Sequence, residues 1–323
     1  MRGIAFLLAL VAAPAIAQTI VKVKAFPGVQ ALALMAAESQ RLFERQGLEV
    51  QLVFTSTSQE QRDGLAKGEF EIAQSAVDNA VAMVEAAHED VVIVSGGNSG
   101  MNEIIVQPDV RSYADLRGHT LVVDAPNTAY ALQLKKILLM NGLKEGPDYK
   151  LVSVGSTGLR LRAMKENKDY KATMLNLPFF LDAKAAGLKS LGRAVDVTGP
   201  YQANGTFVLR RWALANRETL ERYLAGLIGG TRWALAPENK DAVVKLLVAR
   251  LKISPEIAAT SWELMREPNF GITPDARFDM VGFRKVLGLR AEMEGSWGGR
   301  APSPERYVDL SYYENALKRL ERP

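Results

Sequence analysis

Two successive series of alternating strand-like and helix-like segments constrain the fold of this chain more than any other feature. Short apolar or alternating runs, which suit strands, are separated by longer segments with helical spacing of apolar residues. The strand-like runs lie at 20–26, 48–54, 70–73, 91–94 and 103–107 in the first series, and at 121–123, 149–154, 171–175 and 188–191 in the second. Such alternation is typical of parallel sheets covered by helices. The sequence therefore predicts an α/β protein with two lobes, each a mostly parallel sheet flanked by helices.

The segment 109–128 predicts the boundary between the two lobes. Gln107-Pro108 ends a strand-like run, because proline cannot donate to a sheet ladder and favours extended geometry before it. We place one hinge crossing there and the other at the turn-rich segment 200–204, after which 205–209 predicts a strand of the first lobe. A chain of 323 residues is too long for one ordinary core, which agrees with two lobes. The expected first lobe comprises residues 18–107 and 205–323, and the second comprises 108–204.

The N-terminus predicts a secretory signal peptide. A positive start, Met1-Arg2-Gly3, precedes an apolar run from Ile4 to Ala13, and Ala15-Ile16-Ala17 offers a cleavage site of small residues. The apolar run is shorter than the roughly 20 residues that a membrane-spanning helix needs. A buried N-terminal helix is the alternative, although no amphipathic face is visible. We therefore expect residues 1–17 to be removed on export.

Composition and motifs argue against several classes of chemistry. The chain has no cysteine, which excludes disulfides, thiolate metal sites and a cysteine nucleophile. The two histidines, His88 and His119, have no partners at a metal-binding spacing, and no nucleophile elbow, Walker A loop or dinucleotide fingerprint is present. The glycine-rich run 96–100 lacks the lysine of a phosphate loop and favours a flexible rim loop. A net charge of +4 without a basic, aromatic-rich run argues against nucleic acid. We expect no catalytic residue, metal or cofactor.

Small hydrogen-bonding residues gather in the loops that follow the predicted strands. In open parallel sheets, ligands bind outside the carboxyl ends of the strands, where helix N-termini offer N–H donors and a partial positive charge. The candidate ligand-binding residues are Gly28, Gln30, Thr55, Ser56, Thr57, Ser75, Asp78, Asn98, Asn102, Asn127, Thr128, Thr157, Arg160, Asn176 and Pro178. Any one of them could be an ordinary helix cap, a role that also suits Thr57 and Asp78. Their recurrence in both series favours a cleft between the lobes.

Arg160 is the only arginine close behind these loops. It lies one turn into the helix that follows Thr157, so it could form an ion pair with an anionic ligand. A solvated helix arginine is the alternative. Phe26, Phe179 and Tyr201 could wall the pocket, although core packing is the more usual role of such aromatic residues. The loop chemistry therefore predicts a small organic anion as ligand.

Four segments in order resemble a known family. They are Leu34 to Val50 (LMAAESQRLFERQGLEV), Gly64 to Ala76 (GLAKGEFEIAQSA), Asp115 to Gly118 (DLRG) and Asp309 to Leu317 (DLSYYENAL). Together they resemble periplasmic solute-binding proteins of ABC importers, in the nitrate/sulfonate/taurine and thiamine-precursor branch. The chain departs from the usual motifs at Glu71, where aspartate is usual, and at His119, where lysine is usual. Synthases in the thiamine-pyrimidine branch carry a cysteine-rich motif, which this chain lacks.

The resemblance implies a type 2 periplasmic-binding-protein fold and a periplasmic location. It implies a monomer without cofactor that binds a small organic anion, such as a sulfonate, carboxylate or aromatic acid, in the cleft between the lobes. The expected partner is an ABC permease in the inner membrane. Two alternatives stay open, namely a ligand-sensing subunit of a membrane sensor and a periplasmic enzyme on the same scaffold.

Overall fold

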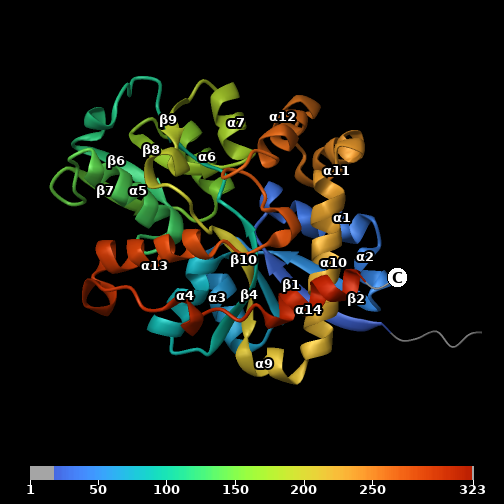
Figure 1. Ribbon diagram of the computed structural model, residues 1–323. Coiled ribbons are helices and arrows are strands. Elements are labelled where there is room, and N and C mark those ends of the chain that lie inside the picture. Colours follow the sequence, from blue (N-terminus) through green and yellow to red (C-terminus); the bar gives the residue numbers. More distant parts are fainter. Residues whose placement is uncertain (1–17, 322–323) are drawn as a thin grey trace, which may run out of the picture.

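The chain folds around two sheets, one for each series of strands and helices (Figure 1). The computed structural model describes residues 18–321, so the expected signal peptide, residues 1–17, lies outside the described residues. The first sheet contains β1 (Thr19–Ala25), β2 (Leu48–Phe54), β3 (Ile72–Ala76), β4 (Val91–Asn98) and β10 (Asn204–Leu209). The second sheet contains β5 (Asn102–Val106), β6 (His119–Val123), β7 (Tyr149–Ser153), β8 (Tyr170–Asn176) and β9 (Lys189–Arg193). We refer to each sheet with the helices on it as a lobe.

Both sheets have the same topology. The strand order is β2-β1-β3-β10-β4 in the first sheet and β7-β6-β8-β5-β9 in the second. In the first, β10 runs antiparallel to both neighbours, and in the second β5 does the same. The remaining strands of each sheet share one direction. The prediction of two mostly parallel α/β lobes is therefore confirmed.

Helices cover both faces of each sheet. Those of the first series are α1 (Leu32–Ser39), α2 (Leu42–Arg45), α3 (Ser58–Lys67) and α4 (Val77–Ala86). Those of the second are α5 (Ala129–Met140), α6 (Thr157–Glu166), α7 (Phe179–Ala185) and α8 (Ala194–Thr198). The C-terminal part contains α9 (Arg210–Ala215), α10 (Arg217–Leu235), α11 (Lys240–Leu251), α12 (Pro255–Met265), α13 (Met280–Glu294) and α14 (Ser311–Leu320). The sequence pattern indicated no helix at α8, α9 or α13, whereas it indicated the other helices.

Local sequence explains the first elements. In β1, Val21 and Val23 are buried while Lys22 faces outward, as expected for a strand with one covered face. The helix α3 begins where the hydroxyl of Thr57 accepts a hydrogen bond from the backbone N–H of Glu60, at 3.1 Å. It ends at Gly68, whose φ of 72° lies in the left-handed region. The capping role predicted for Thr57 is confirmed.

The first crossing between the lobes lies earlier than we predicted. The strand β5 pairs with β8 and β9, so it belongs to the second sheet and the chain crosses at residues 99–101 rather than at Gln107-Pro108. Pro108 ends a strand, but a strand end does not reveal the sheet to which the strand belongs. Gly96 and Gly97 lie inside β4 instead of in a rim loop. A Cβ atom at Gly96 would lie 2.2 Å from the backbone oxygen of Arg277, so this close approach requires glycine.

The two crossings lie side by side. The backbone N–H of Ala203, on the second crossing, donates to the carbonyl of Asn98, at the start of the first, at 3.0 Å. The side-chain oxygen of Asn98 accepts from the N–H of Gly100 and from the amide of Asn204. These bonds hold the two connecting strands together between the sheets.

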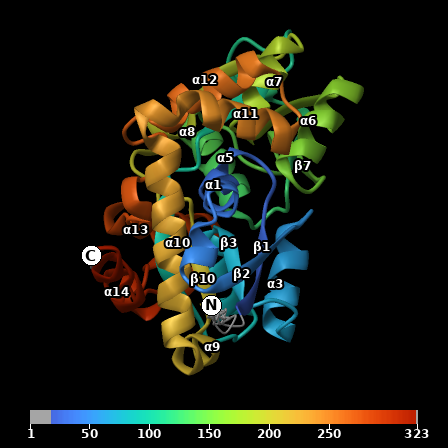
Figure 2. The same cartoon turned by 90° about the vertical axis from the view of Figure 1, so that its right-hand side faces the viewer.

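One apolar cluster extends from the second lobe to the C-terminal helices. The ring of Phe180, on α7, packs 6.4 Å from that of Phe270, which follows α12. Arg193, at the end of β9, lies 4.2 Å over the Phe270 ring and forms an ion pair with Glu267 at 2.6 Å. Figures 1 and 2 both show α12 beside α7. Part of the segment 205–323, which we expected in the first lobe, thus contacts the second.

Tight packing between α1 and α10 leads to a stability prediction. A Cβ atom at Gly230 would lie 2.2 Å from the backbone oxygen of Ala33, so Gly230→Ala should lower the free energy of unfolding by about 1–3 kcal/mol through overpacking. The matched control is Gly229→Ala, where the nearest atom is the flexible end of Leu42 at 3.3 Å. Alanine there should raise stability by up to about 1 kcal/mol. Urea unfolding of both variants would measure the difference, and equal effects would contradict this packing.

Candidate functional site

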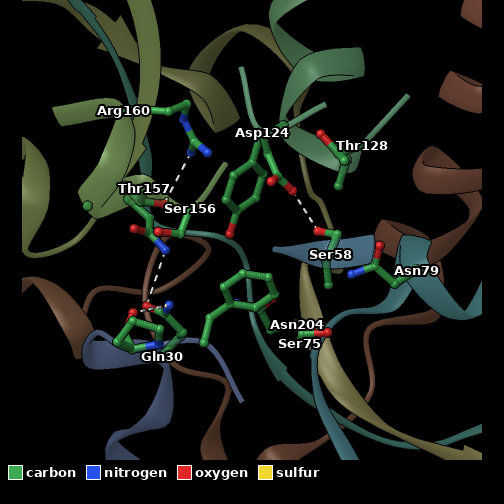
Figure 3. Close-up of a pocket in the computed structure, with 17 residues that line it drawn as sticks. Gln30, Ser58, Ser75, Asn79, Asp124, Thr128, Ser156, Thr157, Arg160 and Asn204 are labelled. Carbon is green, nitrogen blue, oxygen red and sulfur yellow. Dashed lines mark hydrogen bonds between the residues drawn. The ribbon is translucent and has the colours of Figure 1, made fainter. Parts of the chain in front are cut away.

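A cavity of about 50 Å³ lies between the strand ends of the two lobes (Figure 3). Its first-lobe walls are Phe26, Pro27, Gln30, Ser58, Ser75, Ala76, Asn79 and Asn204. Its second-lobe walls are Asp124, Thr128, Ala129, Tyr130, Ser156, Thr157, Gly158, Arg160 and Asn176. The cavity therefore occupies the place where open α/β sheets bind ligands, outside the carboxyl ends of parallel strands.

Several of the candidate residues named from the sequence meet at this cavity. Those that line it are Gln30, Ser75, Thr128, Thr157, Arg160 and Asn176. Thr55 and Ser56 line a neighbouring open groove, and Asn98 lines a smaller cavity nearby. The candidates that contribute no wall to the central cavity or to these two neighbours are Gly28, Thr57, Asp78, Asn102, Asn127 and Pro178.

Arg160 is buried rather than solvated. Its side chain is only 2% exposed. The guanidinium donates to the carbonyl oxygens of Gly155 and Met174, at 2.5 and 3.1 Å, and to the hydroxyl of Thr157 at 3.2 Å. Within residues 18–321 it has no ion-pair partner. Burial lowers the pKa of Arg160, and the Asp124 carboxylate opposes that effect. A cation held only by neutral acceptors at a cavity wall is suited to an anionic ligand group.

Asp124 is a cavity residue that the sequence analysis missed. It follows β6 directly, so the rule that places ligands at strand ends could have found it. One carboxylate oxygen, Oδ2, accepts a hydrogen bond of 2.6 Å from the hydroxyl of Ser58, across the gap between the lobes. The dashed line in Figure 3 marks this bond. Asp124 thus faces the cavity and the opposite lobe at once.

Two further hydrogen bonds close the cavity between the lobes. The backbone N–H of Ser156 donates to the carbonyl of Ser56 at 3.2 Å. The side-chain amide of Asn176 donates to that of Gln30, also at 3.2 Å. All three contacts involve strand ends or the loops and helix starts that follow strands, so the lobes meet around the cavity rim in a closed arrangement.

The cavity also offers amide groups that lack a protein partner. In the described part of the chain, the side-chain nitrogen of Asn79 and the side-chain oxygen of Asn176 are buried without a hydrogen bond. Buried polar groups are normally paired, because an unpaired one costs about 1–3 kcal/mol. One free donor and one free acceptor at the same cavity therefore suit a polar ligand.

The aromatic residues divide between the cavity and the core. Phe26 lines the cavity together with Tyr130, which the sequence analysis did not single out. Burial raises the pKa of the Tyr130 hydroxyl. Tyr201 is buried in the core between β10, α4 and α13, and Phe179 borders the neighbouring groove. Two of the aromatic walls that we considered thus lie outside the cavity.

Asp78 has a structural partner instead of a free carboxylate. Arg290, on the missed helix α13, binds both of its carboxylate oxygens, at 3.0 and 2.7 Å. The same guanidinium donates to Glu294 at 2.5 Å and to the carbonyl of Asn127 at 3.1 Å. Burial alone would lower the pKa of Arg290, but its carboxylate neighbours outweigh burial and raise it. The capping role predicted for Asp78 is also wrong, because α4 begins after Ala76.

A family model for the NMT1-like family matches residues 15–248, well over half of the chain. The chain belongs to the NMT1-like family. That match spans the strands of both sheets, the whole second lobe and every residue that lines the cavity. No curated protein matches the chain.

Solved structures similar to this NMT1-like protein share its fold. The periplasmic nitrate-binding protein NrtA from Synechocystis PCC 6803 has a TM-score of 0.78 and 14% identity, over 95% of this chain and 90% of that one. The alkanesulfonate-binding protein SsuA from Xanthomonas axonopodis pv. citri, bound to MOPS, has a TM-score of 0.71 and 16% identity, over 90% and 98%. The desulfurization enzyme DSZB has a TM-score of 0.66 and 15% identity, over 93% and 99%. The expected type 2 periplasmic-binding-protein fold is confirmed.

The described part of this NMT1-like protein offers neither a metal-binding cluster nor a membrane span. Among residues 18–321, no group of three or more histidine, cysteine, aspartate or glutamate side chains is placed to hold a metal ion. No helix within that part of the chain is long and apolar enough to cross a membrane.

The buried pair of Asp78 and Arg290 leads to a prediction about stability. Arg290→Met should lower the free energy of unfolding by about 3–5 kcal/mol, because it leaves a buried carboxylate without a cation. Adding Asp78→Asn to that variant should recover part of the loss, since no charge then stays unpaired. Arg284→Met, at an exposed position of the same helix, should change stability by less than about 0.5 kcal/mol. Denaturant unfolding of the wild type, these three variants and Asp78→Asn alone checks this, and strictly additive losses would argue against a coupled pair.

Proposed function

We propose that this protein is the exported solute-binding component of an ABC uptake system. In this proposal it binds a small ligand between its lobes and delivers the ligand to a permease in the inner membrane. The observation that carries the proposal is the buried, unpaired guanidinium of Arg160 at a cavity whose walls come from both lobes. Family membership and the fold shared with nitrate-binding and sulfonate-binding proteins support it.

The mechanism is a shift between open and closed arrangements of the lobes. We propose that the first lobe is built on residues 18–98 and the strand from 204, that the second comprises 102–198, and that the lobes hinge at 99–101 and 199–203. A ligand that contacts Arg160 from one side and Gln30 or Asn79 from the other interacts with both lobes only in the closed form. Such a ligand stabilises the closed form in proportion to its difference in affinity for the two forms. No bond is broken in this cycle.

Export and partners follow from the same proposal. The N-terminal residues 1–17 serve as a signal peptide, and the mature chain works in the periplasm as a monomer without cofactor. A sensing subunit would use the same closure to signal to a membrane sensor, and genes for a permease and an ATPase beside this one would favour uptake.

An enzymatic role is the second candidate, because one similar structure is a desulfurization enzyme. The cavity walls supply no histidine or cysteine, and neither histidine of the chain lines the cavity. The hydroxyl of Ser58, at the cavity wall, donates a hydrogen bond directly to the Asp124 carboxylate, with no histidine between them. Conversion of a bound ligand by the purified protein would revive this candidate.

A thermal-shift screen tests the binding function. The panel contains nitrate, sulfonates, carboxylates, aromatic acids and pyrimidines, applied to the mature protein. A ligand with a dissociation constant of about 1 μM corresponds to about −8 kcal/mol. At a hundredfold excess over that constant it should stabilise the fold by about 2.7 kcal/mol. A properly folded protein that no member of the panel stabilises would count against the proposal.

Substitution of Arg160 provides the sharpest single-residue prediction. Arg160→Gln should weaken binding of a ligand found in the screen by about tenfold to a hundredfold, because hydrogen bonds to a charged group contribute about 1.5–3 kcal/mol. The stability of the ligand-free protein should fall little or even rise, since the variant removes a buried cation that lacks a counter-ion. Arg162→Gln, exposed two residues later on α6, is the matched control and should bind normally. Calorimetric titration separates the two outcomes, and equal affinity of the two variants would rule out Arg160 as a ligand contact.

A further inference from the structure

The cavity presents two opposite charges that are not paired with each other. Arg160 is held by neutral acceptors alone, and Asp124 accepts a hydrogen bond only from Ser58. Neither side chain forms an ion pair with any residue between 18 and 321. Figure 3 shows both on the second-lobe side of the cavity, with Ser58 across from Asp124. Each charge is therefore available to a ligand.

The charges behind the cavity wall do not supply the missing partners. Arg62, on α3, feels the field of Asp124, but its guanidinium donates to the side-chain oxygens of Asn79 and Gln59. Arg290 is engaged by Asp78 and Glu294. The Oδ1 oxygen of Asp124 has no hydrogen-bond partner in the described part of the chain, so one acceptor of this carboxylate stays unused.

A simple anion is a poor complement to such a cavity. An anionic group that approaches Arg160 also lies in the field of the Asp124 carboxylate, which repels it, and the low local polarity strengthens both effects. A ligand that carries a second, positive group satisfies Arg160 and Asp124 together. Phe26 and Tyr130 provide the apolar surface for the skeleton between its two ends.

We propose that Asp124 is a specificity-determining residue that makes the cavity selective for a compact zwitterion. The acidic group of this ligand pairs with Arg160, and its ammonium or amidinium group pairs with the free oxygen of Asp124. The small volume of the cavity, about 50 Å³, favours a skeleton of a few atoms. This inference rests on the proposed function. It narrows the expected ligand class from small organic anions to small zwitterions.

Matched pairs of compounds that differ by one ammonium group test the inference. The probes are glycine and acetate, β-alanine and propionate, and 4-aminobutyrate and butyrate, titrated calorimetrically into the mature protein. For the pair of fitting length, the amino member should bind at least tenfold more tightly, a difference of about 1.4 kcal/mol. If the deaminated members bind as tightly, or if no amino member binds, the zwitterion proposal is overturned.

Two variants separate a specificity role of Asp124 from a structural one. Asp124→Asn removes the charge but keeps an oxygen that can accept from Ser58, so the preference for the amino member should fall to about twofold or less. Ser58→Ala removes the bond between the lobes and keeps the charge, so both members should weaken while their ratio persists. An unchanged ratio in Asp124→Asn would show that Asp124 only holds the lobes together.

Failure of this inference is distinguishable from failure of the proposed function. Binding of nitrate, a sulfonate or another anion from the broader screen, without binding of any amino member, overturns the zwitterion class and leaves the solute-binding function standing. If neither panel yields a ligand, both proposals fall together.

Discussion

The structure depends on the two crossings that lie side by side between the sheets. Asn98 ties them together, because its backbone carbonyl accepts from Ala203 and its side chain bonds to Gly100 and Asn204. Each crossing leads directly into the single reversed strand of the sheet that it enters, β5 in one lobe and β10 in the other. With both connections at one place, the strand ends of the two sheets face the same gap. The cavity, its closing hydrogen bonds and any hinge motion follow from that arrangement.

Sequence patterns predicted the local elements well, because each depends on residues close together in the chain. The Thr57 cap and the apolar and alternating runs located the strands and most of the helices of both lobes. The sheet to which β5 belongs depends on pairing with β8, some 70 residues later, and proline at its end carries no information about that partner. The sequence pattern did not predict α13. Its buried stripe of Phe283, Val286 and Leu287 continues with a charged residue, Arg290, and glycines interrupt it.

The candidate site was predictable as a set of loops but not as a set of contacts. Asp78 was named because it lies in a loop after a strand, and Arg160 because it lies one turn behind such a loop. The structure gives the two side chains opposite surroundings. Asp78 finds a cation 212 residues away in sequence, on a helix that the pattern did not reveal. Arg160 turns inward from α6 and finds only neutral acceptors. Packing between residues distant in sequence decides which charged side chain is neutralised within the fold. The sequence alone therefore could not show that Asp78 is paired while Arg160 is not.

The contrast between the paired Asp78 and the unpaired Arg160 is the strongest physical reason to regard the cavity as a candidate binding site. A buried charge without a counter-ion lowers stability, and a hydrophobic or neutral side chain at position 160 would remove that cost. The fold shows that it can neutralise buried arginine, since Arg290 is enclosed by Asp78 and Glu294 a short distance behind the same wall. Among the described residues, Arg160 and Asp124 both lack ion partners at a surface that the two lobes share, so we propose that a ligand neutralises them. In the proposed function, a ligand supplies this neutralisation on binding, which couples occupancy of the cavity to closure of the lobes.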